Sequence, residues 1–220
     1  MPTLTTTIPL TSLTYTIPSL NHTITLHLPN SSKHSAHLPP NSTHRILEIP
    51  LGSHWQPGAH WHEEHTEYIK ILQGTAKVWI NGRVRVLGEG EEVVFERRDV
   101  HNFCRAEIDG GEVLVVEEWT DREDGSKQVF FRNAFSLVRD TEKLGGLLWA
   151  FLRFFYLCSY RDNLLVFGPL CLPFWAQRFV TGVVFGVVRV VGRFAGWRSW
   201  YEEYTPVRLR EVAEGRKKNL

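Results

Sequence analysis

Three histidines and three glutamates fall within the eight residues from His60 to Glu67. Imidazole and carboxylate groups are the usual protein ligands of divalent transition metals. In an extended strand, His60 and His62 point to the same face with Cα atoms about 6.6 Å apart, so both imidazoles can reach one ion. Glu64 shares this phase but lies about 13 Å from His60, which is too far unless the strand bends sharply. The stretch therefore predicts a metal site that uses two of these histidines.

Glu67 is the carboxylate that a chain reversal would bring to the histidines. If Glu63 to Thr66 form a four-residue hairpin loop, Glu67 begins the next strand and faces His60 and His62 across the strand pair. A fourth ligand has to come from another strand. His101, the last histidine of the chain, is the natural candidate. We predict that one metal ion is held by four residues: His60, His62, Glu67 and His101.

Other polar residues near the stretch are weighed against simpler roles. His54 and His65 each lie beside an expected turn, so we expect both to be solvated. Glu63 and Glu64 are expected as loop charges. Glu64, which could reach the pocket if the strand extends, and Tyr68 are nevertheless the candidate catalytic bases. We expect nearby tryptophans to pack in or on the fold rather than to form substrate walls: Trp55, Trp61 and Trp79.

The elements that must position these residues are short β-strands. Period-two alternation between turn residues predicts strands at 23–28, 45–51, 67–72, 76–80, 84–87, 93–96, 102–108 and 113–119. Asn81-Gly82 is a strong signal for a type I′ hairpin turn, because both residues tolerate positive φ. Many short antiparallel strands without intervening helices predict a β-sandwich or a closed barrel.

The spacing of these residues resembles the two sequence motifs of the cupin family. The first motif matches Gly58, His60, His62, Glu67 and Gly74, and the second matches Gly90 and His101. The resemblance covers about residues 44–120 and implies a mainly β fold, a single jelly-roll β-barrel, with the three histidines and Glu67 as metal ligands. The second motif departs from the family at three positions, where Glu96, Arg98 and Arg105 replace the usual Pro, Gly and Asn.

The chain divides into three zones of different composition. Residues 1–43 form a strand and loop segment, residues 44–120 form the barrel core with the metal site, and residues 121–220 form a helical, apolar C-terminal extension. Within the extension, Phe130 to Asn133, the apolar tail and Tyr201 to Pro206 are similar to uncharacterised extended fungal cupins.

The apolar extension leaves several roles open. Its helix-like segments are 144–160, 163–175 and 174–197, and none reaches the roughly 18 uninterrupted apolar residues of a membrane span. Arg178, Arg189 and Arg193 form a narrow stripe on a helical wheel. Packing across the barrel, homodimer formation, contact with a membrane interface through residues 144–197 and a spanning hairpin are the alternatives.

Charge and cysteine content restrict the partners and the compartment. The formal net charge is +1, from 25 basic and 24 acidic residues, so no global field draws the chain onto nucleic acid. Three widely spaced cysteines fit neither a disulfide framework nor a metal knuckle. The N-terminus has no cationic residue and no unbroken apolar core of a secretory signal. These features predict a cytoplasmic protein, with membrane association as the alternative.

We predict a metal-dependent cupin enzyme that acts on a small, largely apolar organic molecule, as expected of secondary metabolism. One divalent ion, Fe, Mn, Zn, Ni or Cu, would permit oxygen activation of the dioxygenase type, or Lewis-acid decarboxylation, isomerisation or cyclisation. The enzyme would thus be an oxidoreductase, lyase or isomerase. Two hypotheses compete with it: a non-catalytic small-molecule-binding or membrane-associated cupin, and a cyclase that works without metal by shape and hydrogen bonding.

Overall fold

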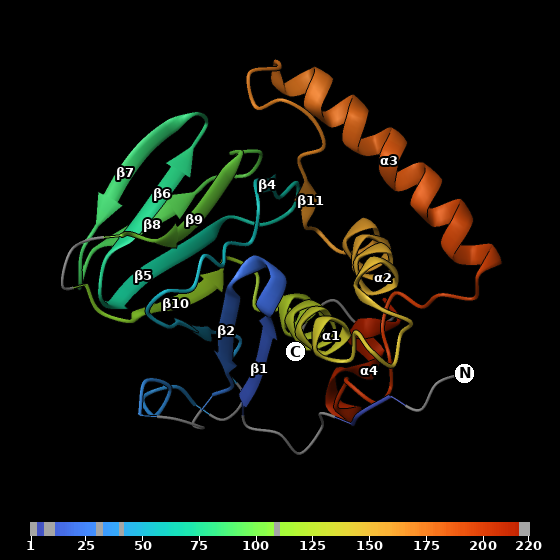
Figure 1. The fold of residues 1–220 in the computed structure, drawn as a ribbon, viewed down its shortest axis with the longest axis horizontal. Coiled ribbons are helices and arrows are strands. Elements are labelled where there is room, and N and C mark those ends of the chain that lie inside the picture. Colours follow the sequence, from blue (N-terminus) through green and yellow to red (C-terminus); the bar gives the residue numbers. More distant parts are fainter. Residues whose placement is uncertain (1–3, 7–11, 30–32, 40–41, 108–110, 216–220) are drawn as a thin grey trace. The chain divides into compact units, whose positions relative to one another are not determined.

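The structure, a computed structural model, describes residues 4–6, 12–29, 33–39, 42–107 and 111–215 (Figure 1). The chain divides into two compact units. Residues 11–122 make up one, here called the barrel unit, and residues 1–10 with 123–220 make up the other, here called the helical unit. Each unit is described by itself below.

The barrel unit contains ten strands among its described residues and one short 3-10 helix, Pro18–Leu20. The strands are β1 (Ser12–Ile17), β2 (His22–His27), β3 (Arg45–Ile49), β4 (His60–Trp61), β5 (Glu67–Gln73), β6 (Ala76–Ile80), β7 (Arg83–Leu87), β8 (Glu92–Phe95), β9 (His101–Arg105) and β10 (Leu114–Thr120). A six-stranded sheet has the order β1-β2-β3-β10-β5-β8, and the second sheet contains the order β4-β9-β6-β7. All pairs within these two orders are antiparallel. The fold class is therefore mainly β with a helical extension, as predicted.

Strict alternation places one face of each central strand in the barrel core. Ile69 and Ile71 of β5 are fully buried, and so are Phe95 of β8 and Val78 of β6. Because successive side chains of a strand point to opposite faces, Glu67 belongs to the same inward face as Ile69. The core-forming alternation thus also decides which polar side chains point inward.

Two turns show why glycine is needed where the sequence has it. Asn81 and Gly82 both have positive φ, 49° and 79°, as the predicted type I′ turn between β6 and β7 requires. Gly74 has a φ of 81°, and a Cβ atom there would lie 2.5 Å from the backbone oxygen of Val113. A side chain at position 74 would therefore push β5 away from the segment before β10.

Three sequence-based expectations about the barrel unit are corrected. Strand β1 was not predicted, and it joins β2 at the edge of the six-stranded sheet. The expected hairpin between the HxH segment and Glu67 is wrong, because β4 pairs with β9 in one sheet while β5 pairs with β10 and β8 in the other. Residues 63–66 are a connection between sheets, and the predicted strand 102–108 ends at Arg105, with Ile108 outside the described residues.

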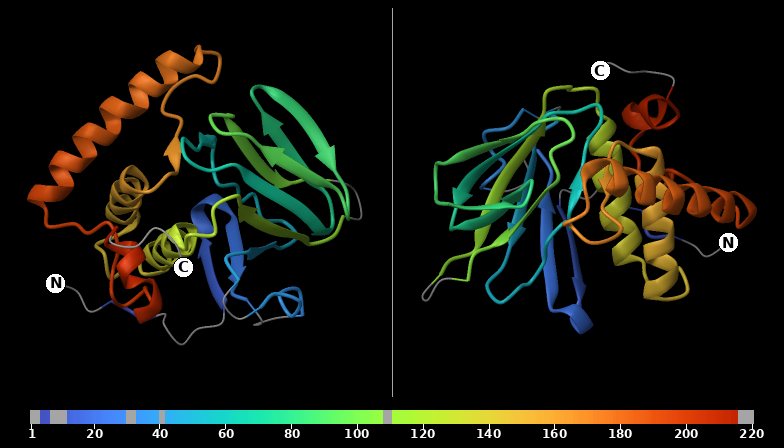
Figure 2. Two further views of the ribbon diagram at one scale, coloured as in Figure 1. Left: turned by 180° about the vertical axis from the view of Figure 1, so that it is seen from behind. Right: turned by 90° about the horizontal axis from the view of Figure 1, so that it is seen from above.

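The helical unit contains four α-helices among its described residues. They are α1 (Ser126–Arg139), α2 (Leu147–Tyr160), α3 (Phe174–Phe194) and α4 (Val207–Ala213), and the short strand β11 (Leu164–Leu165) lies between α2 and α3. Helix α2 packs against both α1 and α3, and α4 packs against α1 (Figure 2). Leu137, Leu157, Phe185 and Tyr204 belong to one buried apolar cluster of this unit. The helical character predicted from about Phe131 begins five residues earlier, and α4 was not predicted.

Two buried polar side chains of α1 and its C-terminal end, Asn133 and Asp140, have several protein partners. The Asn133 side chain donates to the Val129 carbonyl and the Thr205 hydroxyl, at 2.8 and 3.0 Å, and accepts from the Tyr201 backbone N–H at 2.8 Å. Asp140 accepts from the Tyr204 hydroxyl at 3.0 Å and from the Thr5 backbone N–H at 2.7 Å. These bonds tie the segments around α1 together.

Helix α3 differs from the other helices of its unit in length and exposure. Its 21 residues make it the one described helix long and apolar enough, by length and composition alone, to cross a membrane. Only 22% of its most apolar window is buried, although the core helix of a soluble protein that passes this test is mostly buried. Its apolar surface is therefore largely turned away from the unit's core.

Candidate metal centre

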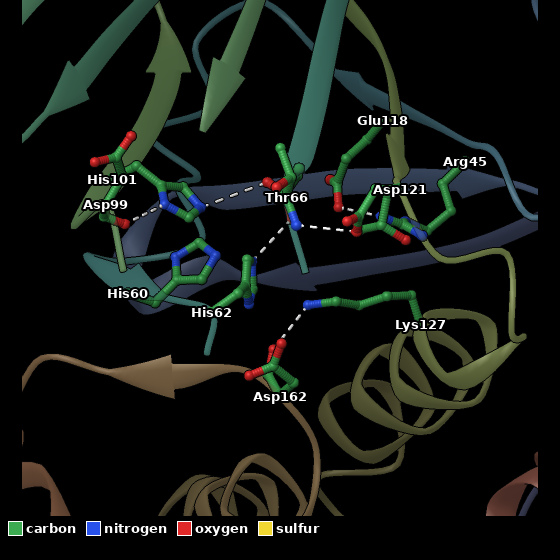
Figure 3. A network of polar contacts seen from close by, with 12 residues as sticks. Arg45, His60, His62, Thr66, Asp99, His101, Glu118, Asp121, Lys127 and Asp162 are labelled. Carbon is green, nitrogen blue, oxygen red and sulfur yellow. Dashed lines mark hydrogen bonds and ion pairs between the residues drawn. The ribbon is translucent and has the colours of Figure 1, made fainter. Parts of the chain in front are cut away.

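The four predicted ligands come from three strands that belong to both sheets. His60 of β4 and His101 of β9 are direct partners in the strand pair, so their side chains leave neighbouring backbone positions toward the same face. His62 follows β4, and Glu67 is the first residue of β5. One ligand atom from each residue lies within 4.8 Å of the others. Figure 3 shows the three imidazoles turned toward one another.

All four side chains of this group, here called the His₃Glu cluster, are buried. None of the residues His60, His62, Glu67 and His101 is more than 4% exposed. Burying ionisable groups costs free energy unless other charges, hydrogen bonds or a metal ion compensate. The cluster therefore needs internal partners or a ligand.

Backbone carbonyls orient two of the three imidazoles. Nδ1 of His60 lies 2.8 Å from the carbonyl oxygen of Gly58, and Nδ1 of His101 lies 2.8 Å from that of Asp99. Because a carbonyl oxygen only accepts, each Nδ1 carries the proton and donates it. Each Nε2 is thereby left with a lone pair directed into the cluster, which is how ligating histidines are normally held.

Glu67 is the anionic member of the cluster. Its carboxylate lies 3.0 Å from Nε2 of His62 and 3.5 Å from Nε2 of His101. Burial by itself raises the pKa of Glu67, but the interactions with the adjacent His101 and His62 imidazoles outweigh it and hold the pKa well below the usual range. Burial, and next the charges of His101 and His62, lower the pKa of His60 well below its ordinary value. A neutral imidazole at His60 and an ionised Glu67 are the forms that bind metal.

The cluster fits a divalent metal ion better than a closed hydrogen-bond network. The buried Nε2 of His101 has no hydrogen bond of normal geometry within the described residues, and its 3.5 Å separation from Glu67 is too long for one. Three imidazoles and one carboxylate are suitable ligands for Fe(II), Mn(II), Zn(II), Ni(II) or Cu(II). The donor set and the orphaned nitrogen are both consistent with an ion held by these four residues.

The surroundings of the cluster are apolar. The ring of Phe95 stacks on the imidazole of His101, with centroids 4.2 Å apart and planes 8° from parallel. Ile69 follows Glu67 on the inner face of β5, and Phe103 follows His101 on the same face of β9, and both are buried. These side chains keep water from part of the cluster and fix the His101 ring plane.

The turn before His101 contains two of the three departures from the cupin motif. Arg98, where the family has Gly, adopts a φ of 73°, a left-handed conformation that costs a residue with a Cβ atom of order 1–2 kcal/mol. Two contacts accompany it: the Arg98 N–H donates to the His62 carbonyl at 2.8 Å, and its Nε donates to Glu63 at 3.0 Å. The turn therefore docks on the HxH segment.

The other two departures do not touch the four ligands through any described hydrogen bond. Glu96, where the family has Pro, donates its backbone N–H to Asp99 at 3.0 Å, a bond that proline cannot make. Its carboxylate accepts from the Thr66 hydroxyl at 3.4 Å. Arg105, in place of Asn, donates to the Ala106 carbonyl at 3.2 Å. All three departures thus leave the ligand set intact.

A buried ion pair on the inner face of the barrel was not predicted. Arg45 of β3 and Glu118 of β10 are direct strand partners, and their side chains meet at 2.5 Å with each 3% exposed (Figure 3). Glu118 also lies opposite Ile69, so the pair shares the inward face of the six-stranded sheet. The alternation of β10, where Val116, Glu118 and Thr120 share one phase, is the signal that could have placed a charge inside.

The structure places the remaining candidates away from the ligands. Glu64 is exposed, and its carboxylate pairs with Arg122 at 3.3 Å. Tyr68 lies on the face of β5 opposite to Glu67, and its ring stacks on Trp119 with centroids 5.5 Å apart. A catalytic role for Glu64 or Tyr68 stays a prediction that this geometry does not favour.

Of the two histidines expected to be solvated, only His54 is exposed. His65 is 3% exposed, so the expectation for it is wrong. The connection between the sheets draws it inward, and Thr66 beside it is held by Asp121, whose side chain accepts the Thr66 N–H at 3.0 Å. Trp55 and Trp61 are buried, as expected of packing residues.

Comparison with known families now gives this site and fold a context. Residues 45–117 match the sequence profile of the family described as "Cupin domain". The chain therefore contains a cupin domain over these residues, and strands β3 to β10 form its jelly roll, while β1 and β2 precede the matched residues. This agrees with the resemblance inferred from the motif residues.

Two curated fungal relatives match a larger part of the chain. A protein named oxidoreductase from Beauveria bassiana is 24% identical over 206 residues, which cover 76% of this chain and 65% of the relative. A protein named epoxidase from Aspergillus terreus is 28% identical over 155 residues, which cover 68% of this chain and 47% of the relative. The chain thus spans about half to two-thirds of the length of these relatives.

Solved structures of cupins are similar to part of the chain. A cupin-2 domain protein from Rhodospirillum rubrum has 18% identity and a TM-score of 0.38, over 50% of this chain and 67% of that one. KdgF from Halomonas has 21% identity and a TM-score of 0.34, over 45% of this chain and 81% of that one.

Proposed function

We propose that this protein is a metal-dependent oxidoreductase that oxidises a small, largely apolar organic molecule in its cupin domain. The observation that carries the proposal is the His₃Glu cluster, in which four buried ligand atoms lie within 4.8 Å of one another. Enzymatic activity in general is supported by relatives named oxidoreductase and epoxidase, and those names favour oxidation over Lewis-acid decarboxylation, isomerisation or cyclisation.

The residues of the cluster have distinct parts in this proposal. His60, His62 and His101 supply neutral nitrogen ligands, and Glu67 supplies one negative charge that offsets half the charge of a divalent ion. A divalent ion that takes more than four ligands would keep exchangeable coordination positions at this site, and would supply redox or Lewis-acid chemistry toward a small molecule. The carbonyls of Gly58 and Asp99 hold two of the imidazoles in the ligating tautomer.

The neighbouring side chains support an apolar substrate. Phe95, Ile69 and Phe103 lie beside or follow the ligands on the inner faces of their strands, and none of them carries a charge. Such walls favour an apolar body over a charged one. Arg45 and Glu118 add a polar contact further along the inner face, which is suited to a hydroxyl or carbonyl group.

Metal analysis tests the first half of the proposal. We expect purified wild-type protein to carry close to one divalent ion per chain, and a His60→Ala/His101→Ala variant to carry almost none. His54→Ala is the matched control, because His54 is an exposed histidine outside the cluster. Equal, substoichiometric metal in wild type and the double variant would contradict the proposal.

Oxygen uptake tests the second half. We expect metal-loaded wild type to consume oxygen with at least one member of a panel of small, largely apolar organic compounds, and the double variant to consume none. Metal-dependent product formation without oxygen uptake would instead identify a Lewis-acid enzyme. Product formation that survives metal removal would identify a metal-free cyclase, and binding without turnover would identify a binding protein.

A further inference from the structure

Helix α3 exposes a continuous apolar face. Seven of its large apolar side chains are exposed, by between 47% at Val191 and 88% at Phe194. Isolated exposed apolar residues are ordinary, but a contiguous row along one helix marks a contact surface. The exposed row consists of Trp175, Phe179, Val183, Val187, Val190, Val191 and Phe194.

This face points away from the core of the helical unit. The buried residues of α3 are Gln177, Thr181, Phe185, Val188 and Gly192. At about 100° per residue, their sector is centred roughly 160° from the centre of the exposed apolar row. Within the helical unit, Gly192 packs so closely against Tyr156 of α2 that a Cβ atom at position 192 would overlap the Tyr156 ring. A helix on the surface of a soluble unit would normally present polar residues opposite its buried face.

Positive charge lies beside the apolar row. Arg178, Arg189 and Arg193 are exposed and fall within about 60° of one another on the helical wheel, between the buried and the apolar sectors. Between Asn163 and Tyr201 the sequence contains four arginines and no acidic residue. Arginine therefore gives this segment an excess of positive charge.

We propose that α3 lies in the plane of an anionic lipid surface, with its apolar row in the acyl boundary and its arginines at the phosphate groups. Around the axis of α3, the sector buried against the protein is followed by the arginines and then by the exposed apolar row. A helix that lies in a membrane interface has its charged residues beside its apolar face in this way. If the α3 of a second copy packed on this face instead, it would bring the same arginines. Its segment 163–201 would bring no acidic residue to pair with them. A spanning orientation would require the buried sector to leave α2.

Co-sedimentation with vesicles tests this placement on the full-length chain. We expect binding to vesicles of phosphatidylcholine with phosphatidylserine, and much weaker binding to phosphatidylcholine alone. Each arginine near an anionic surface strengthens binding roughly fivefold. Arg178→Gln/Arg189→Gln/Arg193→Gln should therefore weaken binding about a hundredfold.

A matched pair of variants separates the apolar row from general surface hydrophobicity. Phe179→Ser/Val187→Ser/Val190→Ser removes exposed side chains of α3 and should abolish binding, with helix content retained by circular dichroism. Val84→Thr/Val86→Thr removes exposed apolar side chains of β7 and should leave binding unchanged. Equal binding by the α3 variant and wild type would overturn the proposal.

Two other results would overturn it as well. A dimer in light scattering that the α3 serine variant makes monomeric, together with no vesicle binding, would assign the face to a second copy. Retention in the bilayer after alkaline carbonate extraction would assign α3 to a spanning orientation.

Discussion

The two units of the chain break the usual distribution of polar and apolar residues in opposite ways. The barrel unit buries charged and titratable side chains, namely the His₃Glu cluster and the Arg45–Glu118 pair. The helical unit instead exposes a row of large apolar side chains on α3. Each arrangement costs free energy in an isolated chain in water unless a partner compensates, and the partners that we propose are a metal ion inside the barrel and a lipid surface at α3.

Buried polar groups alone do not identify a site, as the helical unit shows. Asn133 and Asp140 are as buried as the cluster residues, but each has several protein hydrogen-bond partners that join segments of the unit. The His101 Nε2 has none of normal geometry among the described residues. An orphaned atom does not by itself mark a ligand, because Nη1 of Arg132 and Oε1 of Gln177 in the helical unit also have no hydrogen-bond partner among the described residues. The convergence of four donor atoms is what distinguishes the His₃Glu cluster.

The largest stability effect is expected from the ion pair inside the barrel. Glu118→Ala leaves the Arg45 guanidinium buried without its carboxylate, which should lower the free energy of unfolding by about 3–5 kcal/mol. Arg45→Met/Glu118→Leu removes both charges and should cost much less. Urea unfolding measures both variants. A loss of under about 1 kcal/mol in the single variant would mean that the pair is not desolvated.

A smaller loss is expected from the polar network of the helical unit. Asn133→Ala removes the acceptor of the buried Tyr201 N–H and the donor to Thr205, and should cost about 1–3 kcal/mol. Thermal unfolding followed by circular dichroism measures the loss. Metal content should stay at the wild-type value, since Asn133 has a structural role, and a parallel loss of metal would break the contrast between the two units.

Replacing Arg98, whose backbone adopts a left-handed conformation, should increase stability, whereas the two preceding substitutions decrease it. Arg98→Gly relieves a φ of 73°, while the ion pair lost with Glu63 is largely exposed and contributes little. We expect a gain of up to about 1 kcal/mol in urea unfolding. A loss of stability or of metal affinity would show that the Arg98 side chain supports the HxH segment.

The dependence of stability on acid pH should be a smaller effect. It involves Glu117 of β10, on the outer face of the six-stranded sheet. The hydrogen bond from His44 lowers the pKa of Glu117 below its ordinary value of 4.5, against burial and with help from His37. A depressed pKa stabilises the fold above pH 4.5, and this contribution is lost as the pH falls through the folded-state pKa. Glu117→Gln should therefore flatten the stability profile below pH 4.5. An unchanged profile would exclude Glu117 as a contributor.

Much of the barrel could be predicted because its strands have local signals. Strand β6 has the predicted bounds, β5 and β7 differ by one residue at one end, and β8 and β10 differ by one residue at both ends. Strand pairing could not be predicted in the same way, because alternation shows which face is buried but not which strand lies next to it. This is why the hairpin between His62 and Glu67 was expected and is absent.

The candidate site could likewise be predicted only in part. Residues within a sequence motif could be identified, whereas contacts between distant elements could not. Motif spacing selected His60, His62, Glu67 and His101, and the structure brings these four together. The burial of His65 depends on elements distant in sequence, so no local pattern gave it. The alternation of β10 could have placed Glu118 inside, but its pairing with Arg45 depends on which strand lies next to β10. Helix α4, with seven residues, is too short for a periodic signal.

X-ray absorption at the edge of the bound metal tests the central claim most directly. Wild-type protein should show a first coordination shell of nitrogen and oxygen only, with the outer-shell scattering of about three imidazoles. His101→Ala should lose one imidazole contribution, whereas His54→Ala should match wild type. A sulfur scatterer, or a spectrum that His101→Ala leaves unchanged, would contradict the assignment of these four residues as the metal ligands.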